Sequence, residues 1–263
     1  MPGLNSGLFV GLTGIQAQQS ALNVVGNNIA NVNTPGYSRQ RADLQSTGSL
    51  YSGGVFYGTG VTLNDVQGLR NQFLDLQIYR ETARQSGASD RNASLSAISP
   101  TLSDSGTTGL ASKIQAFFQG FQDLAARPED AALRTNVIGQ AQNMISAMQS
   151  QYQMLTDQRN VADQSVQNLV GQVNTLTSQI ANLNSVISTE VTPGSRNDAR
   201  DQRAALTSQL AKLVGINVTE GSRGEYQITL DSGAAVLVSG STQYQLSAST
   251  IGPNGYHLVQ ASQ

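Results

Sequence analysis

The amino-acid sequence predicts a mainly α fold: an elongated helical bundle with one long heptad helix, an N-terminal amphipathic helix, and a smaller antiparallel β region at the C-terminal end. Two runs of apolar residues, near residues 8–29 and 138–187, are spaced alternately three and four apart, which predicts amphipathic helices. Residues 226–230 instead alternate between apolar and polar, as in a half-buried strand.

Composition favours long thin helices over a thick globular centre. The 263 residues are enough for one large domain or two smaller ones, but only 38% are hydrophobic, 5% are aromatic, and Trp is absent. Charged residues make up 12% with a net charge of −2, and no Lys/Arg-rich run occurs, which argues against nucleic-acid binding.

Targeting and redox signals are sparse. No run approaches the roughly 20 apolar residues that span a bilayer, so membrane insertion is not expected. The first positive charge is Arg39, and the apolar run at residues 8–10 is too short for a secretory signal. Cysteine is absent, which removes disulfides and thiolate chemistry.

The N-terminal helix is expected over residues 5–31. Gln19 and Gly26 occupy two positions of its heptad seam, and the others are large apolar residues: Leu8, Leu12, Ile15, Leu22 and Ile29. The stripe has no adjacent helix in the sequence and precedes a glycine-rich segment. We therefore expect it to pack against a partner helix, with an internal core as the alternative.

A turn is expected directly after this helix. Pro35 pushes Thr34 out of the α region, and Gly36 supplies a positive φ, which together fit a type II turn. The residues of this signature turn are Asn28, Asn31, Asn33, Thr34, Pro35, Gly36 and Tyr37.

The chain then changes character. Five glycines between residues 48 and 60 punctuate short β-prone pieces, so residues 38–66 are expected to form extended loops and a small hairpin. A helix is expected over residues 69–97, ended by Pro100 and the Ser-Asp-Ser-Gly cluster at residues 103–106. Another is expected over residues 110–124.

The second heptad series predicts a helix on the order of 75 Å long. It is preceded by Pro128, Glu129 and Asp130, a typical helix start, and Pro193-Gly194 is expected to end it. We expect the stripe to be ordinary bundle core. Only Arg159 interrupts its positions, which are Ile138, Ala141, Ile145, Met148, Tyr152, Leu155, Ala162, Val166, Leu169, Val173, Leu176, Ile180, Leu183 and Ile187.

The last elements complete the predicted architecture. A helix over residues 197–214 is expected to return antiparallel to the long helix, with Leu206, Leu210 and Leu213 inward. From Ile216 onward, the pieces at residues 226–230, 236–238 and 244–246 predict a β meander. The chain thus divides into an N-terminal helix and turn (1–36), a Gly-rich segment (37–66), an elongated helical bundle (67–215) and a β region (216–263).

Candidate catalytic and metal-binding residues are few. The single histidine, His257, lacks a second strong metal ligand. The acid pairs Glu129-Asp130 and Asp198 with Asp201 suggest a glycosidase-like pair, but a helix start complementing the dipole and a solvated ion-pair surface with Arg196, Arg200 and Arg203 are favoured. We predict no catalytic, cofactor-binding or metal site.

Residues 27–34, which read Asn-Asn-Ile-Ala-Asn-Val-Asn-Thr, resemble the N-terminal signature of the bacterial flagellar rod, hook and hook-associated axial proteins. The continuation through residues 34–40 is similar to the hook-associated members, as are the Asp-Gln-Arg run at 201–203 and residues 224–229. The resemblance implies a structural subunit that joins hook to filament by helix packing, without a cofactor. It implies three kinds of partner: hook protein, the second junction protein and copies of itself.

The resemblance also implies an extracellular protein exported through the flagellar type III apparatus without a cleaved peptide. Similar chains are about twice as long and end in a second heptad helix that pairs with the N-terminal one. We therefore expect an N-terminal half, whether a fragment or a truncated product, with an incomplete β region.

Three alternatives remain open from the sequence. The first is a rod or hook protein, and the second, of a different class, is a cell-wall glycan hydrolase associated with the flagellum. The third is an unrelated coiled-coil effector or adhesin, which explains the heptads but not the asparagine-rich turn.

Overall fold

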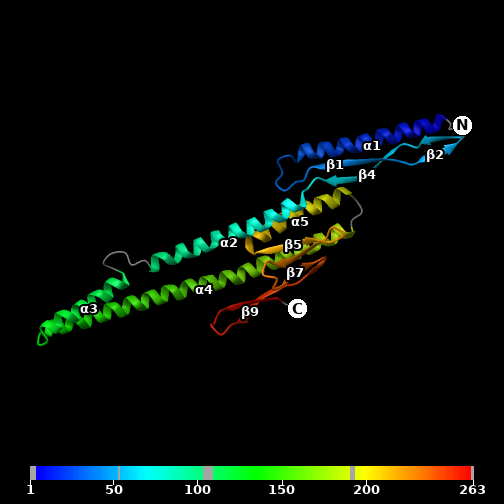
Figure 1. The fold of residues 1–263 in the computed structure, drawn as a ribbon. Coiled ribbons are helices and arrows are strands. Elements are labelled where there is room, and N and C mark those ends of the chain that lie inside the picture. Colours follow the sequence, from blue (N-terminus) through cyan, green and yellow to red (C-terminus); the bar gives the residue numbers. More distant parts are fainter. Residues whose placement is uncertain (1–3, 53, 103–108, 190–192, 262–263) are drawn as a thin grey trace. The chain divides into compact units, whose positions relative to one another are not determined.

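The computed structural model describes residues 4–52, 54–102, 109–189 and 193–261. Within these residues the chain forms five helices and ten strands, shown in Figure 1. In chain order they are α1 (Leu4–Ala30), β1 (Gln40–Ser46), β2 (Ser49–Ser52), β3 (Val55–Gly58), β4 (Val61–Gly68), α2 (Gln72–Leu102), α3 (Leu110–Ala126), α4 (Ala131–Thr189), α5 (Pro193–Leu213), β5 (Ile216–Glu220), β6 (Tyr226–Leu230), β7 (Val236–Ser239), β8 (Thr242–Gln243), β9 (Leu246–Ile251) and β10 (His257–Ala261).

The chain divides into two compact units. Unit 1 contains residues 1–84, 172–246 and 261–263, and unit 2 contains residues 85–171 and 247–260. Helices α2 and α4 are therefore each divided between the two units. The four-segment division expected from the sequence stays a prediction.

The N-terminal part of unit 1 is a helix lying against a β ribbon. Strands β1 and β4 pair antiparallel with an irregularity at Asp43/Leu44, and β2 and β3 continue the ribbon as a hairpin. Figure 1 shows β1 and β4 alongside α1, whose buried residues are Ala17 and Val24. The expected helix and hairpin are confirmed.

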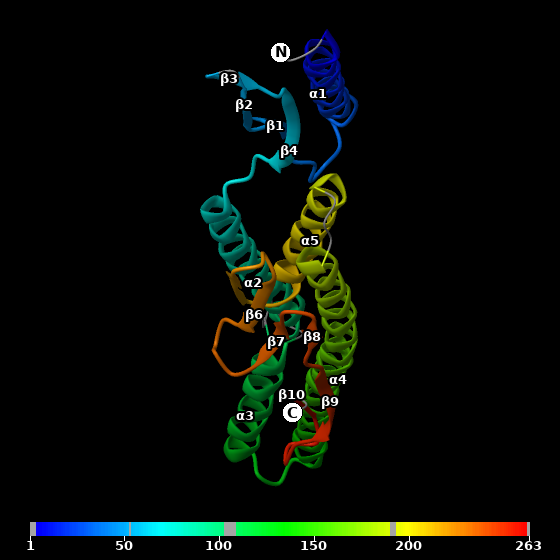
Figure 2. The ribbon, with the colours of Figure 1, turned by 90° about the vertical axis from the view of Figure 1, so that its right-hand side faces the viewer.

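The remainder of unit 1 packs α4 and α5 on a small sheet. Strands β5-β6-β7-β8 form an antiparallel meander in sequence order, as predicted. Figure 2 shows α5 beside the C-terminal part of α4. The core joins both helices to the sheet through Val173, Ile180, Ile187, Leu210, Ile216, Ile228, Leu237 and Val238, all buried.

Unit 2 contains α3, the first part of α4, part of α2 and the β9–β10 hairpin. Gly120 of α3 is buried against α4, where an added Cβ would lie 3.4 Å from Cγ2 of Val137. Glycine thus permits close helix approach. The rings of Phe117 and Phe121 meet edge to face, with centroids 4.9 Å apart.

The mainly α fold with a long heptad helix and an antiparallel β region is confirmed, but two expected helix ends are wrong. Helix α2 continues through Pro100 to Leu102, so the helix tolerates the loss of the main-chain hydrogen bond to residue 96 that Pro100 cannot make. The cluster at residues 103–106 lies outside the described residues. Pro193 opens α5 instead of ending α4, since its fixed φ suits the first position of a helix.

The strand expected at residues 244–246 is also wrong. Strand β8 ends at Gln243, and Leu246 begins β9 in a different sheet. The physical reason is Asn174 of α4, whose Oδ1 accepts from the Leu246 amide at 2.8 Å while its Nδ2 donates to the Leu246 carbonyl at 2.8 Å. These bonds draw the chain out of the meander and onto the helix.

The long apolar stripe is core along only part of its length. Val173, Ile180 and Ile187 are buried as expected, but five large stripe residues of unit 2 are exposed, namely Ile138, Ile145, Met148, Tyr152 and Leu169. In that part of α4 the covered face includes Val137 and Met144, each one position before a stripe residue. One position is about 100° around a helix, so the stripe is turned away from α3.

Candidate functional site

The five stripe residues of α1 face away from the β ribbon. Leu8, Leu12, Ile15, Leu22 and Ile29 are between 50% and 70% exposed. Ala17 and Val24, on the other side of the helix, are buried. The ribbon therefore covers one face of α1 and leaves the heptad stripe uncovered among the described residues. An exposed apolar stripe of this length is typical of an interaction surface.

The sequence around this stripe lacks charge. The first charged residue of the chain is Arg39, so none lies within α1. Surface helices normally carry charged residues on their solvent face, whereas the cores of protein interfaces are depleted of them. The combination of exposed apolar residues and no charge therefore favours packing against other protein.

The signature turn has the predicted geometry. The Tyr37 amide donates to the Thr34 carbonyl at 3.2 Å, and Gly36 has φ 84°, as a type II turn requires. The Thr34 amide in turn donates to the Asn31 carbonyl at 2.9 Å. Asn33 and Pro35 lie exposed at the surface of the turn.

Asn28 fastens the turn to the start of β1. Its Oδ1 accepts from the Gln40 amide at 2.8 Å and from the Tyr37 hydroxyl at 3.0 Å, and its Nδ2 donates to the Gln40 carbonyl at 2.8 Å. Burial, assisted by the charges of Asp198 and Asp201, raises the pKa of Tyr37, which keeps its hydroxyl available as a donor. Asn28 thus fixes the angle at which the chain leaves α1.

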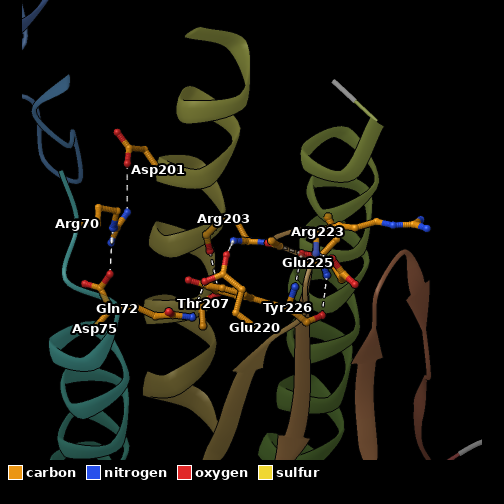
Figure 3. A network of polar contacts seen from close by, with 12 residues as sticks. Arg70, Gln72, Asp75, Asp201, Arg203, Thr207, Glu220, Arg223, Glu225 and Tyr226 are labelled. Atoms are coloured by element: carbon orange, nitrogen blue, oxygen red, sulfur yellow. Dashed lines mark hydrogen bonds and ion pairs between the residues drawn. The ribbon is translucent and has the colours of Figure 1, made fainter. Parts of the chain in front are cut away.

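Polar contacts tie this N-terminal part to α5 (Figure 3). Asp201 accepts from the Ser38 amide at 2.7 Å and from Arg70 at 3.2 Å, and Arg70 also pairs with Asp75 at 3.0 Å. Arg196 pairs with Asp65 at 3.3 Å. The Asp/Arg cluster of α5 therefore holds the segment that follows α1.

The expectation that this whole cluster is a solvated ion-pair surface is wrong. Arg203 is only 1% exposed, and its Nη1 donates to Asn184 Oδ1 of α4 at 2.8 Å and to the Gly224 carbonyl. Tyr226 lies beneath the guanidinium group. Burial lowers the pKa of Arg203 and raises that of Tyr226. The spacing on α5 turns Arg203 inward while Arg196 and Asp201 stay nearer the surface.

Asn184 completes this buried network. Its Nδ2 donates to the carbonyls of Tyr226 at 2.9 Å and Gly240 at 2.7 Å, and its Oδ1 also accepts from the Tyr226 amide at 3.0 Å. Nothing in the sequence singles out Asn184 or Asn174, because each lies beside the apolar stripe in a helix rich in polar residues. Only the Asp-Gln-Arg run containing Arg203 gave a signal.

Two further candidate catalytic residues, His257 and Asp130, have structural partners. His257 donates its amide to Asp163 at 2.8 Å and pairs with the same carboxylate through Nδ1 at 2.7 Å, and Arg159 lies 4.0 Å from the Tyr256 ring centroid. These contacts fasten the β9–β10 hairpin to α4. Asp130 accepts from the amides of Ala132 and Leu133, which makes it the N-terminal cap of α4.

Within the described residues, no group of three His, Cys, Asp or Glu side chains is arranged to hold a metal ion. None of the helices in the same part of the chain has the length and apolarity needed to cross a membrane.

Comparison with known proteins places two family models on the chain. The helical domain of the flagellar hook-associated protein FlgK matches residues 95–262, and the flagella basal body rod protein family matches residues 8–37. A rod protein, FlgG of Agrobacterium fabrum, is 56% identical over 37 residues, or 14% of either chain. Similarity to the rod protein is thus confined to a short segment.

Hook-associated relatives match much more of the chain. Flagellar hook-associated protein 1 of Salmonella typhimurium is 37% identical over 240 residues, 90% of this chain and 43% of the relative. The solved structure of the flagellar hook junction protein FlgK from Burkholderia pseudomallei covers 70% of this chain and 33% of its own, with 26% identity and a TM-score of 0.61.

This chain spans less than half the length of the hook-associated relative from Salmonella. The family model nevertheless covers more than half of it, from residue 95 to residue 262. Together with the rod-type segment at residues 8–37, these matches show that the chain belongs to the flagellar hook-associated protein FlgK family.

Proposed function

We propose that this chain is a structural subunit of the bacterial flagellum that helps join the hook to the filament. The observation that carries the proposal is the uncharged α1 helix, whose five stripe residues stay exposed while its opposite face rests on the β ribbon. A helix of this kind supplies binding through apolar burial, at about 25 cal/mol per Å².

The partners of the stripe are other axial proteins: hook protein, the second junction protein and copies of this chain. Residues 1–36 act as the assembly segment. The signature turn sets its direction, since Asn28 and Asp201 hold the two sides of the turn. The protein works outside the cell, in the flagellum, and is exported without a cleaved signal peptide.

The chain performs no reaction in this role. Two of the four acids that suggested glycan hydrolysis have structural roles: Asp130 caps α4, and Asp201 holds Ser38 and Arg70. The unmodified chain and the variants Glu129→Gln and Asp198→Asn are incubated with purified cell-wall glycan. Release of sugar by the unmodified chain that is lost in either variant would overturn this statement. The expected result is no release by the unmodified chain.

Location within the flagellum separates the junction role from the rod and hook alternatives. The tagged chain is produced in cells that lack hook-associated protein 1, and isolated hook–basal bodies are viewed by immunogold electron microscopy. The proposal predicts gold at the distal end of the hook. Gold along the rod or along the hook body contradicts the junction role, as does the absence of gold from the whole structure.

A further inference from the structure

The β2–β3 hairpin, which we call the arm, is apolar on both faces. Tyr51 pairs with Phe56 and Leu50 pairs with Tyr57 across the two strands. Successive residues of a strand point to opposite faces, so one pair lies on each face. All four side chains are exposed, Phe56 by 69%, and the rings of Tyr51 and Phe56 have centroids 4.9 Å apart.

The arm also lacks the usual protection of an exposed strand. Between Asp43 and Asp65 the sequence contains neither a charged residue nor a proline. Exposed edge strands in soluble proteins normally carry charges or prolines that prevent pairing with other chains. A hairpin that lacks charges and prolines and is apolar on both faces needs a protein surface against each face to cover its side chains. It therefore fits a groove better than a flat surface.

A groove of this kind lies at the base of the arm, between α1 and the ribbon. It has a volume of about 380 Å³, and Phe9, Thr13 and Gln16 of α1 line one side, while Thr47, Thr59 and Leu63 of the ribbon line the other. Gly60, with φ 121°, lets the ribbon approach α1, since a Cβ there would lie 2.2 Å from Oγ1 of Thr13. The lining residues are uncharged, like the arm.

The arm cannot fill the groove of its own chain. Hydrogen bonds from the Thr47 amide to Gly60 and from the Thr59 amide to Gly48 hold the arm in line with β1 and β4. Tyr51 lies four residues beyond Thr47, or about 13 Å further along an extended strand. The tip therefore points away from the groove that its own base lines, and the groove stays open to the arm of another molecule.

We propose that the arm of one copy of this chain inserts into the groove between α1 and the ribbon of a second copy. The tip and the groove lie at opposite ends of the same arm, so the contact is head to tail and repeats from copy to copy. Both surfaces are uncharged, so neither leaves a charge buried without a partner. The contact rests on the proposed function, because it operates where copies stand side by side in the flagellum.

Single cysteines test the contact, because the chain has none of its own. Equal amounts of the Phe56→Cys and Gln16→Cys variants are added to isolated hooks and oxidised. A disulfide forms only when the two Cα atoms come within about 7 Å. The proposal predicts that the mixed dimer is the main cross-linked product and that unmodified chain, but not the Tyr51→Asp/Phe56→Asp variant, suppresses it by competition.

Gln18→Cys is the matched control. Gln18 is an exposed glutamine of the same helix, but lies about 200° around α1 from Gln16. The Phe56→Cys and Gln18→Cys pair should give at least tenfold less mixed dimer. Equal yields from the two pairs, or products formed only between identical variants, overturn the arm contact.

Sedimentation of the chain with hooks is scored in the same samples. Chain that sediments without mixed dimers contradicts the arm contact and leaves the proposed function standing. Mixed dimers without sedimentation contradict the proposed function and leave the arm contact standing. A sample that shows neither mixed dimers nor sedimentation contradicts both the arm contact and the proposed function.

Discussion

The guanidinium carbon of Arg203 lies 3.5 Å from the centroid of the Tyr226 ring, and both residues are buried. This contact joins α5 to β6, while Asn184 brings in α4 through bonds to both residues. Desolvated cation–π contacts stabilise by about 2 kcal/mol, and hydrogen bonds to a charged group add about 1.5 to 3 kcal/mol each. Arg203 is therefore the main polar anchor of unit 1.

Replacement of Arg203 by alanine should lower the free energy of unfolding by about 3 kcal/mol, because Asn184 Oδ1 and the Gly224 carbonyl lose their buried donor. Urea denaturation followed by circular dichroism measures the change. Arg84→Ala, which removes an ion pair exposed on both sides, is the control and should change the free energy by less than about 0.5 kcal/mol. Similar effects from the two variants would refute the anchor role.

The signature turn offers a second test at Asn28. Asn28→Ala removes one donor and one acceptor that hold Gln40, so the Gln40 amide should exchange its hydrogen at least about tenfold faster, equivalent to about 1.4 kcal/mol. Asn28→Asp keeps the acceptor and should have a smaller effect. Exchange followed by NMR reports both variants. An unchanged Gln40 rate in Asn28→Ala would show that the side chain does not hold the turn.

Local sequence signals predicted most of the elements. The three-four spacing from Leu8 and from Ile138 predicted α1 and α4, and Pro35-Gly36 predicted the turn type. These features depend on neighbours within a few residues, so a single sequence contains them. Two helix ends were misplaced, because Pro193 suits the first position of α5 and α2 tolerates the hydrogen bond lost at Pro100.

Contacts between distant residues could not be predicted. Asp201 meets Ser38 across 163 positions, and the direction in which α5 turns Arg203 depends on α4 and β6. Periodicity also does not reveal which part of an apolar stripe packs against another element. Ile180 is buried, whereas Ile138 of the same series is exposed. For α1, the exposed stripe agrees with the expectation of partner packing, but the partner itself stays a prediction.

Two glycines should respond to alanine in opposite directions. Gly36 has φ 84°, so Gly36→Ala should destabilise the turn by about 1 to 2 kcal/mol. Gly26 lies inside α1, and an added Cβ there meets nothing within 4 Å, so Gly26→Ala should stabilise the helix by up to about 1 kcal/mol. Thermal unfolding by circular dichroism gives both signs. If both substitutions raise, or both lower, the melting temperature, the positive φ of Gly36 or the helical conformation of Gly26 is contradicted.

The attachment of the β9–β10 hairpin should weaken in acid. The backbone amide of His257, followed by its ring, holds the pKa of Asp163 below its ordinary value. A carboxylate with a lowered pKa stabilises the folded arrangement above its unfolded pKa of about 3.9, and the stabilisation is lost as the pH falls through the lower folded value. The protection of the His257 amide, measured as its exchange rate relative to an unfolded chain at the same pH, should therefore decrease below about pH 4.

Asp163→Asn should show the faster His257 exchange already at neutral pH, because the neutral amide oxygen is a weaker acceptor for the His257 amide than the carboxylate. Asp157→Asn, which alters an exposed carboxylate bonded to Gln153, is the matched control and should leave His257 unchanged. If His257 exchanges at the same rate in all three proteins, the carboxylate does not fasten the hairpin.

Incorporation of a stripe variant at the hook shows whether the exposed face of α1 mediates assembly. Leu12→Asp combined with Leu22→Asp places two charges on the exposed face of α1 and leaves Ala17 and Val24 untouched. The matched control, Gln142→Asp with Gln149→Asp, adds the same charge to exposed positions of α4. Incorporation is scored by immunogold at hook tips, and melting of the remaining helices by circular dichroism. We expect no incorporation of the stripe variant, normal incorporation of the control and unchanged melting of both. Normal incorporation of the stripe variant would contradict this assembly role of α1.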